Sequence, residues 1–176
     1  MIFFVTAMAM PKTAWAQSYD TNGFGVDGAN QPAVKTTDKY DINGDGVNDK
    51  VYEIGNAGQL FWFAALVNGD NTHADFDAQN TSASAVLTND IDLENREWKP
   101  ITAFAGSFDG QGHTVSNFKI TPTTNNSGFF GSANGTIMNF TLKGAITLSA
   151  AGAEIGSIVG NTDGATIRNI ASYVNI

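Results

Sequence analysis

One group of residues has the spacing of a calcium-binding loop. Residues 41–49 follow the D-x-[DN]-x-[DN]-G start of an EF-hand-like loop. Ca²⁺ takes about 6–8 oxygen ligands, and side chains at positions 1, 3 and 5 of such a tight turn converge on one point. We therefore expect a structural Ca²⁺ site within residues 41–53. Its predicted ligands are Asp41, Asn43, Asp45, the backbone carbonyl of Val47, Asp49 and Glu53.

The end of this loop departs from the motif. Position 12 is Tyr52, where the motif has a bidentate Glu, and the carboxylate follows one residue later at Glu53. Glu53 reaches the ion only if the loop is distorted; otherwise the site is open and weak. The alternative is a solvated turn of Asp, Asn and Gly that binds no ion.

Two further groups of acidic residues have spacings that catalysis uses. Asp90 and Asp92 share one face of a predicted strand, and a carboxylate pair ~5–9.5 Å apart serves as acid and base in glycoside hydrolysis. Asp109 and His113 flank a glycine-rich turn, but no nucleophile motif accompanies them. On the outer face of a strand, solvated or turn-forming side chains are the commoner arrangement. We therefore assign no catalytic residue and expect a protein that is not an enzyme.

Composition excludes several classes of partner. The chain has 9 Lys and Arg against 17 Asp and Glu, a net charge of −8, which argues against binding to nucleic acid or to an anionic membrane. It has 19 Gly and no Cys, so disulfides cannot stabilise it. A glycine-rich chain with 42% hydrophobic residues suits short strands joined by many turns.

The elements that position these residues are one helix and a series of strands. A helix is predicted over residues 56–69, with Asn56 as N-cap and Gly69 as stop, and it is apolar nearly all round. From residue 85 onward the pattern changes to strands. The pattern T-[VI]-x-N-[FI] begins at residues 114, 136 and 166, which makes the intervals 22 and 30 residues.

Such a period indicates a solenoid in which each coil contributes the same strand. We expect the three copies to stack in register. The expected inward columns are Val115, Ile137 and Ile167, and Phe118, Phe140 and Ile170; the expected asparagine ladder is Asn117, Asn139 and Asn169. A β-sandwich with similar turns is the alternative.

A resemblance to a known family rests on an ordered set of motifs over residues 50–176. The motifs are Y-E-I at 52–54, A-G-Q-L at 57–60, L-V-N at 66–68, L-T-N-D-I-D-L at 87–93, W-K-P-I at 98–101, G-S-F-D-G-Q-G-H-T-V at 106–115 and G-F-F-G at 128–131, with G-S-I-V-G at 156–160 as a second copy of the last. The chain resembles the GLUG-motif repeat proteins of bacterial cell surfaces. The resemblance implies right-handed β-helix-like stacks and adhesion-like or matrix roles, and such repeats also accompany secreted peptidases. It implies no catalytic residues.

The ends of the chain suggest export. Residues 1–16 are an apolar run that ends in A-x-A, as in a signal peptide cleaved after Ala16, although no basic residue precedes the run. Either the true start lies upstream, or the segment is a buried strand. Residues 17–40 are expected to be a flexible arm or linker.

Because Ile176 directly follows a coil, we expect that the chain is truncated and that the gene continues with further coils.

Together these features predict an all-β protein, a right-handed parallel β-helix of about three coils with one N-terminal capping helix, over residues 54–176. The expected function is a secreted or cell-surface bacterial module with a structural or adhesive role. Its expected partner is an extracellular glycan or a host or matrix protein, with no membrane insertion of the mature chain. The alternatives are a polysaccharide lyase or glycoside hydrolase on the same scaffold, or an accessory domain of a secreted peptidase.

Overall fold

The computed structural model describes residues 18–121, 126–147 and 154–176, and the predicted signal peptide lies outside them. Within these ranges the chain forms ten strands and one helix, α1 (Ala57–Asn68). The strands are β1 (Val34–Tyr40), β2 (Asp49–Ile54), β3 (Ser84–Leu87), β4 (Ile91–Asp92), β5 (Ser107–Asp109), β6 (Thr114–Ile120), β7 (Phe130–Ala133), β8 (Thr136–Ile146), β9 (Val159–Thr162) and β10 (Thr166–Asn175).

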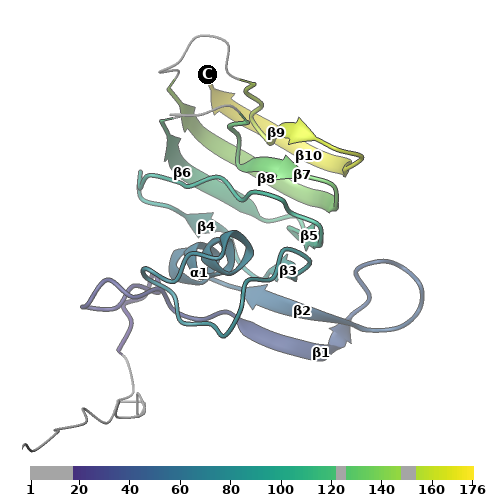
Figure 1. Cartoon of the computed structure of the whole chain (residues 1–176), viewed down its shortest axis with the longest axis horizontal. Coiled ribbons are helices and arrows are strands. Elements are labelled where there is room, and N and C mark those ends of the chain that lie inside the picture. The colour runs from purple at the N-terminus through teal and green to yellow at the C-terminus, as the bar shows by residue number, and fades with distance from the viewer. Residues whose placement is uncertain (1–17, 122–125, 148–153) are drawn as a thin grey trace, which may run out of the picture.

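The strands stack as the turns of a β-solenoid. In one row β2, β3, β5, β8 and β10 pair in parallel, and Figure 1 shows this row rising from the α1 end to the C-terminus. A second parallel row joins β4, β6 and the later part of β8, and β7 pairs with β9 in a separate sheet. The predicted all-β solenoid with a helix is confirmed. It has about four turns, against the three coils expected.

The repeated pentapeptide stacks in register in two of its three copies. Thr166 lies opposite Thr136, and Ile170 lies opposite Phe140, as predicted. The first copy is displaced: Thr114 lies opposite Thr141, and Ser107 takes the place beneath Thr136. One turn here takes 29 or 30 residues, so the 22-residue interval brings the first copy to the next face of the solenoid rather than to the same one.

Glycines let neighbouring turns approach closely on the face formed by β7 and β9. A Cβ placed on Gly128 would lie 2.5 Å from the carbonyl oxygen of Gly156 and 2.9 Å from the nitrogen of Gly160. A Cβ on Gly160 would lie 2.5 Å from the carbonyl carbon of Asn126. The glycines of the G-F-F-G and G-S-I-V-G elements therefore bring two backbones into contact that any larger residue would separate.

The helix α1 has the predicted caps. The Asn56 side chain accepts a hydrogen bond from the Gln59 backbone N–H (2.9 Å), and Gly69 adopts a left-handed conformation (φ 71°) with its N–H donating to the carbonyl of Ala65. Most α1 side chains are buried, and Phe63 meets the rings of Phe104 and Phe108 in the solenoid interior. The helix therefore shares the solenoid's core, because its apolar surface needs cover on nearly every side.

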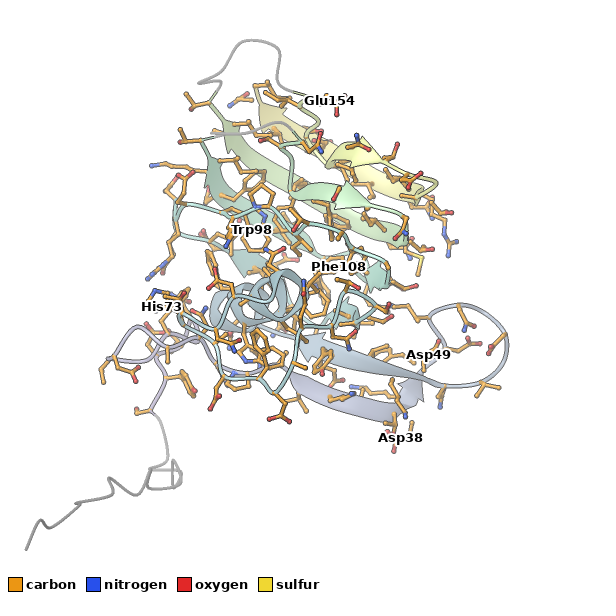
Figure 2. The ribbon with its side chains drawn as sticks, viewed as in Figure 1. Asp38, Asp49, His73, Trp98, Phe108 and Glu154 are labelled. Atoms are coloured by element: carbon orange, nitrogen blue, oxygen red, sulfur yellow. The ribbon has the colours of Figure 1, made fainter. Side chains whose placement is uncertain are left out.

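Aromatic side chains fill the interior (Figure 2). The rings of Trp98 and Phe129 stack 4.5 Å apart, and the Trp98 indole N–H donates to the Phe129 carbonyl at 2.8 Å. Val115 and Ile137 of the predicted inward column are fully buried. Ile167, the third predicted member, is 40% exposed because it lies on the last described turn.

The segment expected to be a linker, residues 17–40, is instead packed on the domain where it is described. β1 pairs antiparallel with β2, with Val34 opposite Glu53 and Tyr40 opposite Asp49. Farther upstream, the Arg96 guanidinium lies 3.8 Å from the centre of the Phe24 ring. The sequence of β1 gave no alternating strand pattern, because five of its seven residues are exposed and only Thr36 and Tyr40 are partly buried.

Candidate functional site

The predicted calcium loop is a turn held by the side chain of its first residue. The Asp41 carboxylate accepts hydrogen bonds from the backbone N–H groups of Gly44 (2.8 Å), Asp45 (3.1 Å) and Gly46 (2.8 Å). Both glycines have positive φ, 80° and 86°, which explains why the motif places glycine there. The first half of the loop thus folds locally, around one carboxylate.

The other predicted ligands in the loop make similar contacts. Asn43 accepts from the Asp45 N–H at 2.9 Å, and Asp45 accepts from the Val47 N–H at 2.8 Å. Asp49 accepts from the Ile42 N–H (2.9 Å) and from the Asn43 amide (3.3 Å). The structure therefore links Asp41, Asn43, Asp45 and Asp49 through one network of turns.

Glu53 lies apart from this network. It belongs to β2, and its carboxylate pairs with the Lys39 ammonium and accepts from the Tyr40 hydroxyl at 2.8 Å. The hydrogen bond from Lys39, followed by that from Tyr40, lowers the pKa of Glu53, and the contacts of Lys39 with Glu53 and then with Tyr40 raise the pKa of Lys39. Glu53 thus fastens β1 to β2 and contacts none of the loop's other predicted ligands.

The donor chemistry of the loop fits a hard cation, but its conformation does not gather the donors. Across residues 18–121, 126–147 and 154–176, no three His, Cys, Asp or Glu side chains converge in a metal-ligating group. The oxygens of Asp41 and Asp45 are directed at backbone N–H groups instead. Ion binding would require these carboxylates to share their oxygens with the metal.

The predicted strand carboxylates Asp90 and Asp92 contact the turn above them. Asp90 accepts from the Thr114 N–H at 2.9 Å and lies 3.2 Å from Nδ1 of His113. The Thr114 N–H, followed by His113, lowers the pKa of Asp90. Asp92 accepts from the amide of Asn117 at 2.9 Å. Both carboxylates therefore join β4 to the turn that carries β6.

Asp109 begins a ladder of side chains at one corner of the solenoid. It accepts from the Asn139 amide at 3.0 Å, and Asn139 in turn accepts from the Asn169 amide at 3.0 Å. Asn117, Asn139 and Asn169 all have positive φ, 57°, 59° and 54°. Asparagine is favoured at these corners because it tolerates the left-handed conformation and bonds along the stack.

The predicted asparagine ladder is therefore divided between two corners. Asn139 and Asn169 belong to one, headed by Asp109, and Asn117 belongs to another, headed by Asp92. Reasoning from the sequence did not assign the aspartates to the ladders, since it considered them as catalytic candidates. The sequence did carry a signal for this, since Asp and Asn recur at the bends, where the side-chain oxygen of either residue accepts a hydrogen bond from the asparagine of the next turn.

The Asn139→Ala variant should lower the free energy of unfolding by about 2–3 kcal/mol. About 1–2 kcal/mol comes from forcing alanine into the left-handed conformation, and the rest comes from the lost amide hydrogen bonds. Asn139→Gly is the matched control, because glycine adopts this φ freely; it should lose about 1 kcal/mol. Urea denaturation of both variants measures the difference, and equal losses would contradict the conformational role of Asn139.

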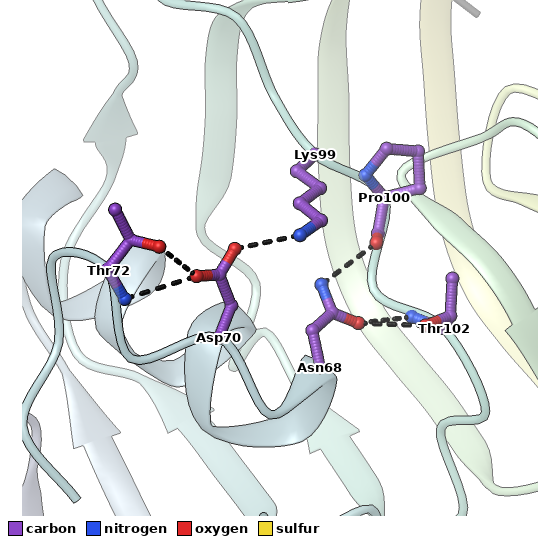
Figure 3. Close-up of polar contacts among 6 residues, drawn as sticks. All are labelled: Asn68, Asp70, Thr72, Lys99, Pro100 and Thr102. Atoms are coloured by element: carbon purple, nitrogen blue, oxygen red, sulfur yellow. Dashed lines mark hydrogen bonds and ion pairs between the residues drawn. The ribbon is translucent and has the colours of Figure 1, made fainter. Parts of the chain in front are cut away.

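Polar contacts also fasten the end of α1 to the following turn (Figure 3). The residues involved are Asn68, Asp70, Thr72, Lys99, Pro100 and Thr102. The Asn68 amide donates to the Pro100 carbonyl (3.1 Å), and its oxygen accepts from Thr102. The Lys99 ammonium lies 2.7 Å from Asp70 and, with Thr72, lowers the pKa of that carboxyl. These contacts fix the helix against residues 99–102.

A row of hydroxyl side chains follows the stack. Strand register places Ser84, Ser107, Thr136 and Thr166 on successive turns. The first three are partly buried and Thr166 is exposed. Each of the first three is followed along its strand by a buried residue, such as Phe108 or Ile137. Because successive side chains of a strand point to opposite faces, the hydroxyl row faces outward.

Comparison with known proteins gives one partial match. The chain is 32% identical over 138 residues to Halomucin of Haloquadratum walsbyi (strain DSM 16790 / HBSQ001), a match that covers 73% of this chain. The chain spans about 1% of the length of that protein. No family model and no solved structure matches the chain significantly. Among the described residues, no helix has the length and apolar character needed to cross a membrane.

Proposed function

We propose that this chain is a solenoid module of an exported surface protein, with a structural or adhesive role. The main support is that the carboxylates considered for catalysis accept hydrogen bonds from neighbouring turns. Asp90 accepts from Thr114, Asp92 from Asn117 and Asp109 from Asn139. Such contacts support a scaffold. The partial match to Halomucin supports a surface location, and the ordered motifs support a right-handed stack of the GLUG-repeat kind.

The proposed partner is an extracellular glycan or a host or matrix protein that contacts the outer hydroxyl row. Ser84, Ser107, Thr136 and Thr166 repeat at the spacing of successive turns. Adjacent strands lie ~4.8 Å apart, so the row offers regularly spaced donors and acceptors to an extended polar ligand.

A binding panel of glycans and matrix proteins tests this role. The chain should be retained on at least one member, and the double variant Thr136→Ala with Thr166→Ala should weaken retention on the order of tenfold, the loss of one or two hydrogen bonds. Thr21→Ala, at an exposed position far along the chain, is the control. Turnover of a glycan would overturn the structural role in favour of a lyase or hydrolase. Retention on no member would overturn the adhesive role.

We also propose that the loop at residues 41–49 binds Ca²⁺ and stabilises the β1–β2 hairpin. Asp41, Asn43, Asp45, the Val47 carbonyl and Asp49 supply oxygen donors, and Asp49 begins β2. An ion bound there would fix the loop on the hairpin, while Glu53 would continue to fasten the strands through Lys39.

Adding Ca²⁺ should therefore raise the melting temperature, and a chelator should reverse the rise. Asp45→Asn keeps the acceptor for the Val47 N–H and removes one charge, so it should weaken Ca²⁺ binding on the order of tenfold. It should leave the melting temperature without Ca²⁺ nearly unchanged. Calorimetric titration measures the affinity, and an unchanged affinity in Asp45→Asn would place the ion elsewhere.

A further inference from the structure

The chain contains four Asn-Gly pairs, at residues 22–23, 43–44, 68–69 and 134–135. Asparagine that precedes glycine is prone to deamidation, because glycine has no Cβ to hinder the attack of its nitrogen on the asparagine side chain. The attack closes a ring, so the Asn-Gly peptide must turn and the glycine N–H must lose its proton. The fold therefore decides which of the four pairs reacts.

Three of the pairs are held in place by the fold. In each of them the glycine N–H donates to a backbone carbonyl, which is a weak base: Gly23 to Asp20 (3.1 Å), Gly69 to Ala65, and Gly135 to Phe104 (3.1 Å). Neighbouring residues also confine these pairs: Asn56 lies against Gly23, Pro100 and Thr102 bond the Asn68 amide, and Gly106 lies against Gly135. Ring closure at any of the three would break these contacts.

The pair in the loop at residues 41–49 has different surroundings. The Gly44 N–H donates to the Asp41 carboxylate at 2.8 Å, and the Asn43 side-chain oxygen accepts from the Asp45 N–H at 2.9 Å. Asn43 and Gly44 are both exposed. Among the described residues, nothing beyond its chain neighbours lies within 4 Å of a Cβ placed on Gly44. A base, a polarised amide and open space thus meet at this pair.

We propose that Asn43–Gly44 is a self-modification site, at which Asn43 deamidates with Asp41 as the general base. The Asp41 carboxylate removes the Gly44 amide proton while that nitrogen forms a bond to Cγ of Asn43. The Asp45 N–H stabilises the negative charge that develops on the Asn43 oxygen. The proton passes to the departing amide nitrogen, which leaves as ammonia, and a five-membered succinimide ring remains.

Water completes the reaction. It opens the ring at either carbonyl carbon, and the product is aspartate or isoaspartate, in which the backbone runs through the former side chain. In total one amide and one water become one carboxylate and one ammonium ion, and nothing is oxidised or reduced. The loop gains a negative charge between Asp41 and Asp45. Because ammonia is lost, the change accumulates with the age of each molecule.

Peptide mapping by mass spectrometry tests the proposal on the intact chain. Trypsin, which cuts after Lys and Arg, places the four pairs on separate peptides, residues 13–35, 40–50, 51–96 and 120–143. At neutral pH, Asn43 should convert at least about tenfold faster than the other three asparagines. A chelator is present throughout, so the result does not depend on the proposed Ca²⁺ site. Conversion of Asn43 no faster than that of the others would overturn the proposal.

The same measurement in guanidinium chloride is the control for the fold. The four pairs should then convert at similar rates, because the contacts that separate them are gone. If Asn43 kept the same advantage in denaturant, its neighbours in sequence and not the folded loop would be the cause, and the assigned geometry would be refuted.

Asp41→Asn tests the base. The new amide oxygen still accepts the Gly44 N–H but is too weak a base to remove its proton, so conversion of Asn43 should slow on the order of tenfold or more. Asp38→Asn, at an exposed carboxylate of β1 outside the loop, is the matched control and should leave the rate unchanged. Circular dichroism should show that both variants keep the fold. An unchanged rate in Asp41→Asn would refute the role of Asp41.

Discussion

The Phe108→Ala variant is expected to lose about 3–5 kcal/mol of unfolding free energy, the usual cost of removing a buried phenyl ring. Phe108 is fully buried, and its ring contacts Phe63 of α1, Phe130 of β7 and Phe140 of β8. The cavity would therefore open where α1, β7 and β8 meet.

Chemical denaturation followed by circular dichroism measures this loss. Val26→Ala is the control, since Val26 is fully exposed and its truncation should change stability by less than about 0.5 kcal/mol. The loss in Phe108→Ala should appear as one cooperative transition that includes α1. A helix that melts separately, with the strands unaffected, would show that α1 does not share the core.

The Gly128→Ala variant should lose about 3 kcal/mol or more, through crowding rather than through a cavity. The three atoms nearest to the added Cβ would be backbone atoms, the oxygens of Gly156 and Phe130 and the nitrogen of Gly160, all within 2.9 Å. Backbone on two stacked strands cannot move aside as a flexible side chain does, so the turns must separate.

Gly164→Ala is the matched control for this substitution. Gly164 has positive φ (81°) but no neighbour within 4 Å of an added Cβ, so its loss should be only the conformational cost, about 1 kcal/mol. Denaturation of the two variants under the same conditions compares crowding with strain. A smaller loss for Gly128→Ala than for Gly164→Ala would contradict the close approach of the turns.

The sequence predicted the solenoid and the helix because their signals are local. The caps at Asn56 and Gly69 depend on residues close in the chain, and each copy at 136 and 166 is a five-residue pattern that can be recognised by itself. The displacement of the copy at 114 is not local, since it follows from the length of each turn. β1 was missed because its partner, β2, and not its own pattern, makes it a strand.

The candidate site was less predictable for a related reason. The loop motif correctly placed turns at Asp41, Gly44 and Gly46, whose hydrogen bonds are local. The partners of Glu53, Asp92 and Asp109 lie on other strands or turns, so the spacing of acidic residues suggested chemistry where the fold has ladders. Carboxylates have the same spacing in both settings, and only the stacking distinguishes them.

The direction of the inter-turn hydrogen bonds has a mechanical consequence. They run along the stack, from the α1 end to β10 in Figure 1, so a pull along that axis loads them one row after another. The two turns from Ser107 to Thr136 and from Thr136 to Thr166 would free 29 and 30 residues, or roughly 100 Å of slack each at ~3.4 Å per residue. The module would therefore yield to tension in steps, as an extensible tether that limits the force passed to whatever it holds.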